Sequence, residues 1–151
     1  GKYMIYRLSS GDVAGLWVTL REVAEAHLVE LRVALQTITA DPQQLVSLDR
    51  AELLEQARRG AIIVIDVRPQ DEYQTAHLPY ARSMPLAEIE QRLDQLPRDR
   101  EIVAYCRGPF CLLSEEALQR LARCGFRVRK LSDGVSEWQA AGLPVERAAA
   151  A

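Results

Sequence analysis

The sequence has few cysteines, no long apolar run and no excess of basic residues. Three cysteines in 151 residues are an odd number and do not suit a secreted scaffold held together by disulfides. No apolar run approaches the ~20 residues that a membrane-spanning helix needs. The net charge of −2 offers no electrostatic basis for nucleic-acid binding. These absences predict a cytoplasmic protein with no membrane partner and no nucleic acid bound by this chain alone.

The residues that are present are typical of a globular domain. Hydrophobic residues make up 48% and charged residues 26%, which are ordinary proportions for a folded protein. A length of 151 residues fits one domain, with or without a small appendage. The chain begins at Gly1 without a start methionine, so we expect it to carry a tag remnant or to be cut from a larger protein.

Residues 1–37 predict a strand followed by a long amphipathic helix. Asp12 can cap a helix that runs from Val13 to Thr37. Apolar residues and one histidine recur at helical spacing along it: Val13, Leu16, Trp17, Leu20, Val23, Ala24, His27, Leu31 and Leu35. A stripe of this length needs a partner. We expect a second copy of the chain, giving a homodimer through residues 13–37; the alternative is packing onto the chain's own domain.

Beyond a linker at residues 38–44, strands and helices alternate up to residue 147, and a disordered tail is expected at 148–151. Strands are expected at 45–47, 62–65, 82–84, 102–105 and 128–131. Helices are expected between 49 and 60 and at 71–76, 86–93, 112–123 and 135–141. The alternation predicts an α/β fold with a five-stranded parallel sheet and helices on both faces. Active sites in such sheets lie at the carboxyl ends of the strands, where Asp66 and Cys106 fall.

The most informative segment is residues 106–111, Cys-Arg-Gly-Pro-Phe-Cys, between an apolar strand and a helical pattern. Backbone N–H groups of such a loop converge in a nest, and the helix N-terminus adds partial positive charge. Both effects lower the pKa of a thiol and stabilise an anion attached to it. We therefore predict that Cys106 is a nucleophile that performs sulfur chemistry.

Three blocks of sequence belong together by their order and spacing. The first is Ile-Asp-Val-Arg at 65–68, with Glu-Tyr at 72–73 and His-Leu-Pro at 77–79. The second is Cys106 on its six-residue loop. The third is Asp-Gly-Val-Ser-Glu-Trp at 133–138, with Ala-Gly-Leu-Pro-Val at 141–145. Together these blocks resemble the rhodanese family of sulfurtransferases, which predicts a rhodanese-like domain at residues 45–147.

The resemblance implies transfer of a sulfane sulfur through Cys106. Its thiolate would attack a small anionic donor such as thiosulfate, become a persulfide, and pass the outer sulfur to cyanide or to a thiol. The persulfide is a covalent intermediate, so no cofactor is expected. Loop N–H groups would cradle it, and a side chain at the mouth, that of Arg107, would attract the donor. The cradle and substrate-binding residues are Arg107, Gly108, Phe110 and Cys111.

The chain departs from the family pattern at three positions. Pro109 stands where glycine is usual in the loop, and it has no N–H to contribute to the nest. Cys111 stands where arginine, serine or threonine is usual. In the first block Tyr80 replaces another glycine, and we expect this change to affect only a turn.

Cys111 has two interpretations. It is a resolving thiol that attacks the Cys106 persulfide and forms a disulfide, which would make the loop a redox switch. Alternatively, it is a small residue that lines the loop. The second interpretation is favoured by the four intervening residues, because a chain wrapped around a nest would hold the two sulfurs apart.

The charged residues of the first block are expected to support the site. Asp66 would brace the loop, and Arg68 would pair with Glu72 or another carboxylate. The alternative is that Asp66 and Arg68 orient the substrate.

Other kinds of site fit the sequence less well. His27 and Glu30 share a helix face, but a lone histidine without a second pair predicts no metal site. A cysteine phosphatase needs an arginine six positions after the nucleophile to clamp phosphate, and that position is Leu112. Sulfur chemistry therefore remains the predicted activity.

The N-terminal segment carries a second resemblance. A strand that ends Tyr-Arg-Leu at 6–8, followed by a long amphipathic helix, resembles the last wing strand and dimerisation helix of ArsR-type winged-helix repressors. Some members of that family carry a C-terminal rhodanese domain. The alternative function is therefore a non-catalytic module, in which Cys106 and Cys111 report sulfur or redox status within a dimeric ArsR-type regulator. The DNA-reading helices would then precede this chain.

Overall fold

A computed structural model describes residues 10–38, 45–46 and 49–147 of the chain. Its strands are β1 (Leu45–Val46), β2 (Ile62–Asp66), β3 (Arg82–Ser83), β4 (Glu101–Tyr105) and β5 (Val128–Leu131). Four of them lie in the order β5-β4-β2-β3, and the two-residue β1 pairs with the outer edge of β5. Every neighbouring pair is parallel. The α/β class and the parallel sheet predicted from the sequence are confirmed.

Helices connect the strands and precede the sheet. The described helices are α1 (Gly11–His27), α2 (Val29–Ile38), α3 (Arg50–Arg58), α4 (Gln70–Thr75), the 3-10 helix η2 (Leu86–Gln95), α5 (Leu112–Arg123) and α6 (Val135–Ala140). None of these helices is both long and apolar enough to cross a bilayer. The predicted N-terminal strand, the predicted tail and nearly all of the predicted linker lie outside the described residues.

Two apolar clusters form the core, one on each face of the sheet. One cluster joins β2 and β4 to α5 and η2, with Ile102 and Leu121 near its centre. The other joins the same strands to α3 and α6, with Val103 and Trp138. Successive side chains of a strand point to opposite faces. Cys106, which follows β4, therefore belongs to the cluster under α5.

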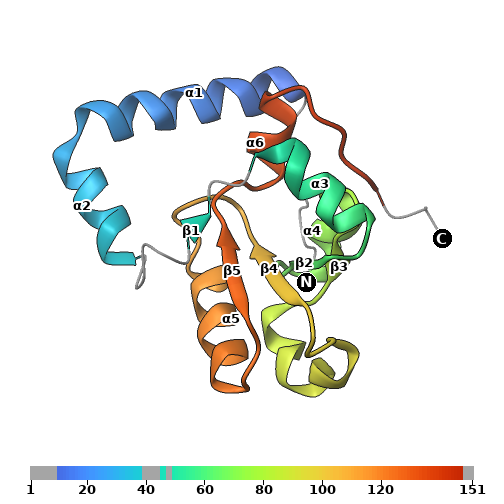
Figure 1. Ribbon diagram of the computed structural model, residues 1–151. Helices are drawn as coiled ribbons and strands as arrows, with labels where there is room; N and C mark the ends of the chain where they lie inside the picture. Colours follow the sequence, from blue (N-terminus) through green and yellow to red (C-terminus); the bar gives the residue numbers. More distant parts are fainter. Residues whose placement is uncertain (1–9, 39–44, 47–48, 148–151) are drawn as a thin grey trace, which may run out of the picture.

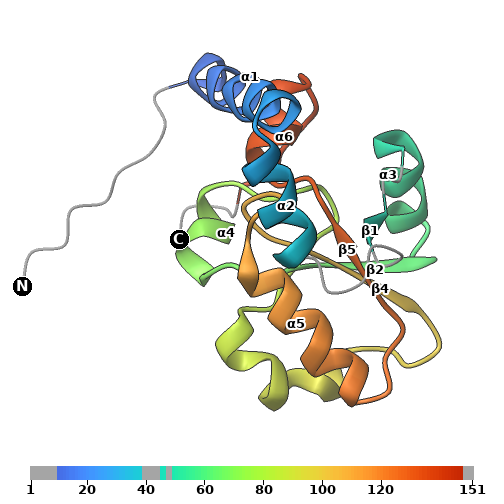
Figure 2. The same cartoon turned by 90° about the vertical axis from the view of Figure 1, so that its left-hand side faces the viewer.

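The N-terminal helix α1 packs against α6 beyond the carboxyl ends of the central strands. Figure 1 shows the arrowheads of β4 and β5 pointing toward these two helices, and Figure 2 shows α1 and α6 side by side from a second direction. Ala14 and Val18 are the buried residues of α1. The helix therefore lies at the edge of the sheet where parallel folds place their active sites.

The prediction of one continuous helix over residues 13–37 is wrong, because two helices meet at Leu28. The backbone of Leu28 is extended, with φ −105° and ψ 108°. Its N–H still bonds to the carbonyl of Ala24 at 2.8 Å, so α1 ends on a completed turn. Neither glycine nor proline marks the break. Tertiary packing overrides the local pattern here, since α1 buries residues on α6 whereas residues 29–37 bury no side chain.

The apolar stripe predicted for this segment is largely exposed. Leu16 is 71% exposed and Leu20 is 60% exposed, with Trp17 and Val23 also more than half exposed. The helix α1 packs on its own domain through a different face, which carries Ala14 and Val18, and not through the predicted stripe. The homodimer stays a prediction.

Candidate functional site

Cys106 and Cys111 meet at the carboxyl end of β4. Cys106 follows Tyr105 and is 1% exposed, and Cys111 directly precedes α5. Their sulfur atoms are joined as a disulfide, with the Cα atoms 6.1 Å apart, an ordinary separation for such a bond. The expectation that the loop would hold the sulfurs apart is therefore wrong. Gly108 allows the turn, because its φ of +124° is a conformation that side chains disfavour.

The loop uses one of its N–H groups for its own turn. The N–H of Cys111 donates to the carbonyl of Gly108 at 3.2 Å. Pro109 has no N–H at all. The predicted cradle for a persulfide therefore depends on the N–H groups of Arg107, Gly108 and Phe110, and its role stays a prediction.

Gly134 supports the loop from behind. A Cβ atom at this position would lie 2.6 Å from the carbonyl oxygen of Cys106 and 2.9 Å from the carbonyl carbon of Arg107. Any other residue would therefore displace the loop. The N–H of Gly134 donates to Oε2 of Glu137 at 2.7 Å. The third sequence block thus brings a glycine and a carboxylate against the cysteine loop.

Asp66 and Arg68 form a buried ion pair at the end of β2. Nη2 of Arg68 lies 2.6 Å from Oδ2 of Asp66 and 2.7 Å from the carbonyl of Ala76. The Tyr105 hydroxyl donates to Asp66 at 2.6 Å. Burial raises the pKa of Tyr105, and the Asp66 charge raises it further, so the hydroxyl stays protonated. Asp66 therefore holds the residue that precedes Cys106, rather than the loop itself.

Arg107 is a half-exposed cation of the loop. Its Nε lies 3.0 Å from Oε2 of Glu72, and the two side chains form an ion pair. Oε2 of Glu72 also lies 3.8 Å from Nη1 of Arg68. Because Asp66 lies only 2.6 Å from Nη2 of Arg68, Asp66 is the nearer partner of Arg68. The cation expected to attract a donor is thus already paired with Glu72.

Lys130 is a buried cation beneath the loop that the sequence analysis did not identify. It lies on β5, is 1% exposed, and donates from Nζ to the carbonyl of Pro109 at 3.1 Å. Burial lowers its pKa, and Glu115, with Oε2 4.0 Å from Nζ, partly offsets that decrease. The one available signal was a lysine within a predicted strand of a chain whose other basic residues are nearly all arginine.

Arg21 ties α1 to the support of the loop and was also missed. Its Nη1 forms an ion pair with Oε1 of Glu137, which is 3% exposed. The other oxygen of Glu137 accepts the N–H of Gly134, so one carboxylate connects α1 to the glycine behind Cys106. A Cβ atom at Gly108 would lie 3.2 Å from Nη1 of Arg21, so this ion pair also borders the loop.

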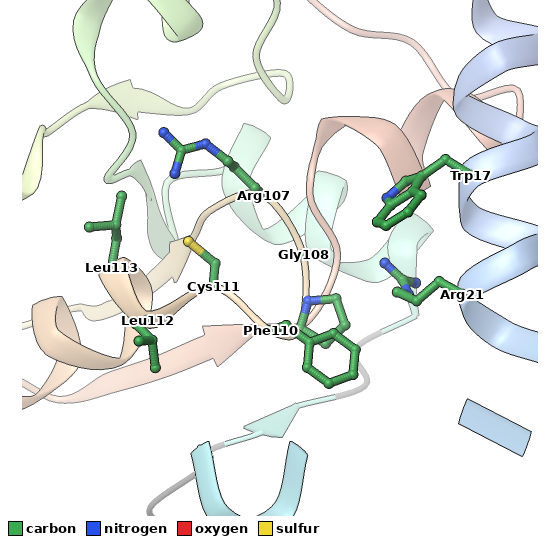
Figure 3. A pocket seen from close by; sticks show the side chains of 9 residues that line it. Trp17, Arg21, Arg107, Gly108, Phe110, Cys111, Leu112 and Leu113 are labelled. Carbon is green, nitrogen blue, oxygen red and sulfur yellow. The ribbon is translucent and has the colours of Figure 1, made fainter. Parts of the chain in front are cut away.

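A cleft of 450 Å³ separates α1 from the loop. It is lined by Trp17 and Arg21 of α1 and by residues 107–113. Figure 3 shows Trp17 and Arg21 reaching from α1 toward the loop, with the sulfur of Cys111 across the cleft. A volume of this size suits a small molecule. The arrangement can therefore admit a small sulfur compound beside Cys111 and the loop that joins it to Cys106.

The comparisons with known proteins agree with this geometry. The model of the rhodanese-like domain matches residues 49–141. The chain is 40% identical over 149 residues to the HTH-type transcriptional regulator Rv0324 of Mycobacterium tuberculosis. The alignment covers 99% of this chain and 65% of the regulator, so the chain spans less than two thirds of the length of that relative.

Two further relatives match more than half of the chain. A sulfurtransferase of Allochromatium vinosum is 32% identical over 85 residues, which cover 56% of this chain and 78% of that protein. The crystal structure of the BH2092 protein from Bacillus halodurans is 31% identical, with a TM-score of 0.61, and covers 77% of this chain and 82% of that one. The loop, its supporting glycine and these matches agree, and the chain belongs to the rhodanese-like domain family.

Proposed function

We propose that this chain is the sulfur- and redox-sensing module of a dimeric ArsR-type transcriptional regulator. The observation that carries the proposal is the disulfide between Cys106 and Cys111, in a loop that shares the carboxylate of Glu137 with α1. The similarity to the mycobacterial regulator supports it, since that alignment extends beyond residues 49–141 into the N-terminal helices.

In this proposal Cys106 receives the sulfur and Cys111 resolves the product. The Cys106 thiolate attacks the outer sulfur of a hydropersulfide R–S–SH, forms Cys106–S–SH and releases the thiolate R–S⁻. The Cys111 thiolate then attacks Sγ of Cys106, forms the disulfide and releases HS⁻. Two molecules of a thiol restore both cysteines and leave as their own disulfide. Sulfane sulfur is thereby reduced to sulfide while the two cysteines are oxidised.

Two features of the loop favour a signal over repeated turnover. Cys111 is within bonding distance of Cys106, the cysteine that would carry the persulfide. A persulfide on Cys106 would therefore be attacked by Cys111 of the same chain soon after it forms. Pro109 removes an N–H from the predicted cradle, which weakens stabilisation of the persulfide anion. Both changes shorten the lifetime of the intermediate that a sulfurtransferase must keep.

Intact mass measurement tests the proposal. We expect the reduced chain, treated with inorganic polysulfide, to lose two hydrogens, about 2 Da, as the disulfide forms. The Cys111→Ser variant should instead gain about 32 Da and keep it, because the persulfide is then not resolved. The Cys106→Ser variant should show neither change. A wild-type chain that keeps the added sulfur would contradict the sensing proposal.

Sulfurtransferase turnover is the second candidate function. The similarity to the Allochromatium vinosum sulfurtransferase and the position of Cys106 after β4 favour it. With thiosulfate as donor and cyanide as acceptor, thiocyanate should then form continuously and depend on Cys106. The Cys111→Ser variant is the informative comparison. Faster turnover in this variant than in the wild type would mean that Cys111 diverts the persulfide, whereas equal and rapid turnover would favour the enzyme.

We also propose that the outer face of α1, formed by Leu16, Leu20 and Val23, is the dimer interface. At 100° per residue these side chains lie on the side of the helix opposite Ala14 and Val18. They are exposed, as an unoccupied interface would be. Sedimentation of Leu20→Glu should give a monomer, with Glu22→Gln as the control on the same helix. An unchanged mass would count against this interface. Trp17 is a poorer test, because it lines the cleft.

A further inference from the structure

The walls of the cleft point to the kind of sulfur donor that this loop accepts. Apolar side chains form most of the lining: Trp17 from α1, Pro109 and Phe110 from the loop, and Leu112 and Leu113 from α5. The two arginines at its edge both have carboxylate partners, Glu137 for Arg21 and Glu72 for Arg107. A divalent anion such as thiosulfate would lose its hydration in this cleft and would find only apolar surface and cations that are already paired. Its binding is therefore unfavourable.

We propose that the cleft binds organic hydropersulfides, R–S–SH, whose apolar group R lies against Trp17. This inference rests on the sensing function proposed above and names its donor class. The reaction is the transfer of the outer sulfur to the Cys106 thiolate, with R–S⁻ as the leaving group. The apolar group of the donor, rather than a charge, provides the binding. Trp17 is a specificity residue supplied by the N-terminal helix, outside the matched rhodanese-like domain.

The position of Trp17 supports this assignment. It lies between the outer face of α1 and the face buried on α6, and Figure 3 shows it directed toward the loop. Trp17 is more than half exposed, so apolar surface is available for a donor to cover. Arg21, one turn further along α1, anchors the helix through Glu137 and keeps this wall of the cleft opposite Cys111. Aromatic side chains in such positions favour apolar and aromatic ligands.

The test compares two donors on a chain that cannot form the disulfide. In the Cys111→Ser background, mass spectrometry measures the rate at which Cys106 gains about 32 Da. The two donors compared are benzyl hydropersulfide and inorganic hydrogen disulfide, HSS⁻. We expect the benzyl donor to react about tenfold faster, and Trp17→Ala to reduce the ratio of the two rates by about tenfold. Trp17→Phe should retain most of the ratio. Leu20→Ala, on the outer face of the same helix, controls for changes in assembly and should retain the ratio.

The outcomes separate the donor class from the sensing function. Equal rates for the two donors, or a ratio that Trp17→Ala leaves unchanged, would overturn the inference while leaving the sensing proposal intact. No added sulfur on Cys106 from either donor would overturn the sensing proposal itself. A ratio that falls in Leu20→Ala as far as in Trp17→Ala would also contradict the inference, because the helix as a whole would then be responsible.

Discussion

The sheet domain, residues 45–147, and the N-terminal helices α1 and α2 are held in place in different ways. The sheet domain buries an apolar cluster on each face. In contrast, α1 packs along α6 with only Ala14 and Val18 buried and with one ion pair to Glu137, and residues 29–37 bury no side chain. A helix that buries so few side chains beside the cysteine loop can change its position while the sheet stays folded. This difference is what a signal from the loop to the helix requires.

The largest effect on this comparison is expected from Asp66→Ala in the sheet domain. The change leaves the Arg68 guanidinium buried without its main partner and removes the acceptor of the Tyr105 hydroxyl. Loss of one member of a buried pair should lower the free energy of unfolding by about 3–5 kcal/mol, as measured by urea denaturation. Asp71→Ala, at an exposed position on α4, is the control. A loss below about 1 kcal/mol would mean that the pair contributes little.

A smaller effect is expected from Arg21→Met, which removes the ion pair that holds α1. Glu137 can then regain water if α1 lifts, so the cost should be limited to about 1–2 kcal/mol. Amide hydrogen exchange should become faster along α1, while β4 and α5 keep their protection. The exposed Arg32→Met on α2 is the matched control. Equal loss of protection in α1 and in β4 would show that the two regions are not independent, and the comparison would fail.

A third test concerns the charge beneath the loop. Burial lowers the pKa of Lys130 in the folded chain, so the unfolded chain keeps this proton to higher pH. The free energy of unfolding should therefore rise with pH between the lowered pKa and the ordinary value of 10.5. In Lys130→Met this contribution should disappear, so the wild type should gain stability relative to the variant as the pH rises toward 10.5.

The difference between the two curves is the quantity to measure. The raised pKa of Tyr105 acts in the opposite direction above its ordinary value of 10.0, because the folded chain then holds the extra proton. This contribution is common to both proteins and cancels in the difference. A difference that does not change with pH would mean that Lys130 titrates alike in the folded and unfolded chains.

Much of the fold could be predicted because local patterns and the final packing agree. The apolar runs that became β2 and β4 are buried on both faces, and alternation with helices requires a parallel sheet. The prediction failed at Leu28, where no glycine or proline marks the end of α1. That break depends on what each half of the segment packs against, and such contacts have no trace in helical spacing.

The residues of the candidate site could be predicted only where their surroundings come from one continuous segment of the sequence. Cys106 was identified from the strand, loop and helix around it. Lys130 and Arg21 were missed because their partners, Pro109 and Glu137, lie 21 and 116 positions away in the sequence. The disulfide was misjudged for a related reason. Spacing gave the number of intervening residues but not the turn at Gly108 that brings the two sulfurs together.

The smallest effect is expected from Tyr80→Gly. This variant tests whether a small change in the stability of the sheet domain alone affects α1. Tyr80 has a φ of +64°, a left-handed conformation that costs a residue with a side chain about 1–2 kcal/mol. Glycine removes this strain but gains freedom in the unfolded chain, so the free energy of unfolding should rise by only about 0.5–1 kcal/mol. Tyr80→Ala keeps the strain and should show no such gain. Because the change affects only this turn before the edge strand β3, hydrogen exchange of α1 should not change. A change in the hydrogen exchange of α1 would mean that the opening of α1 depends on the stability of the sheet domain. The Arg21 ion pair would then not be what connects the helix to the sheet domain.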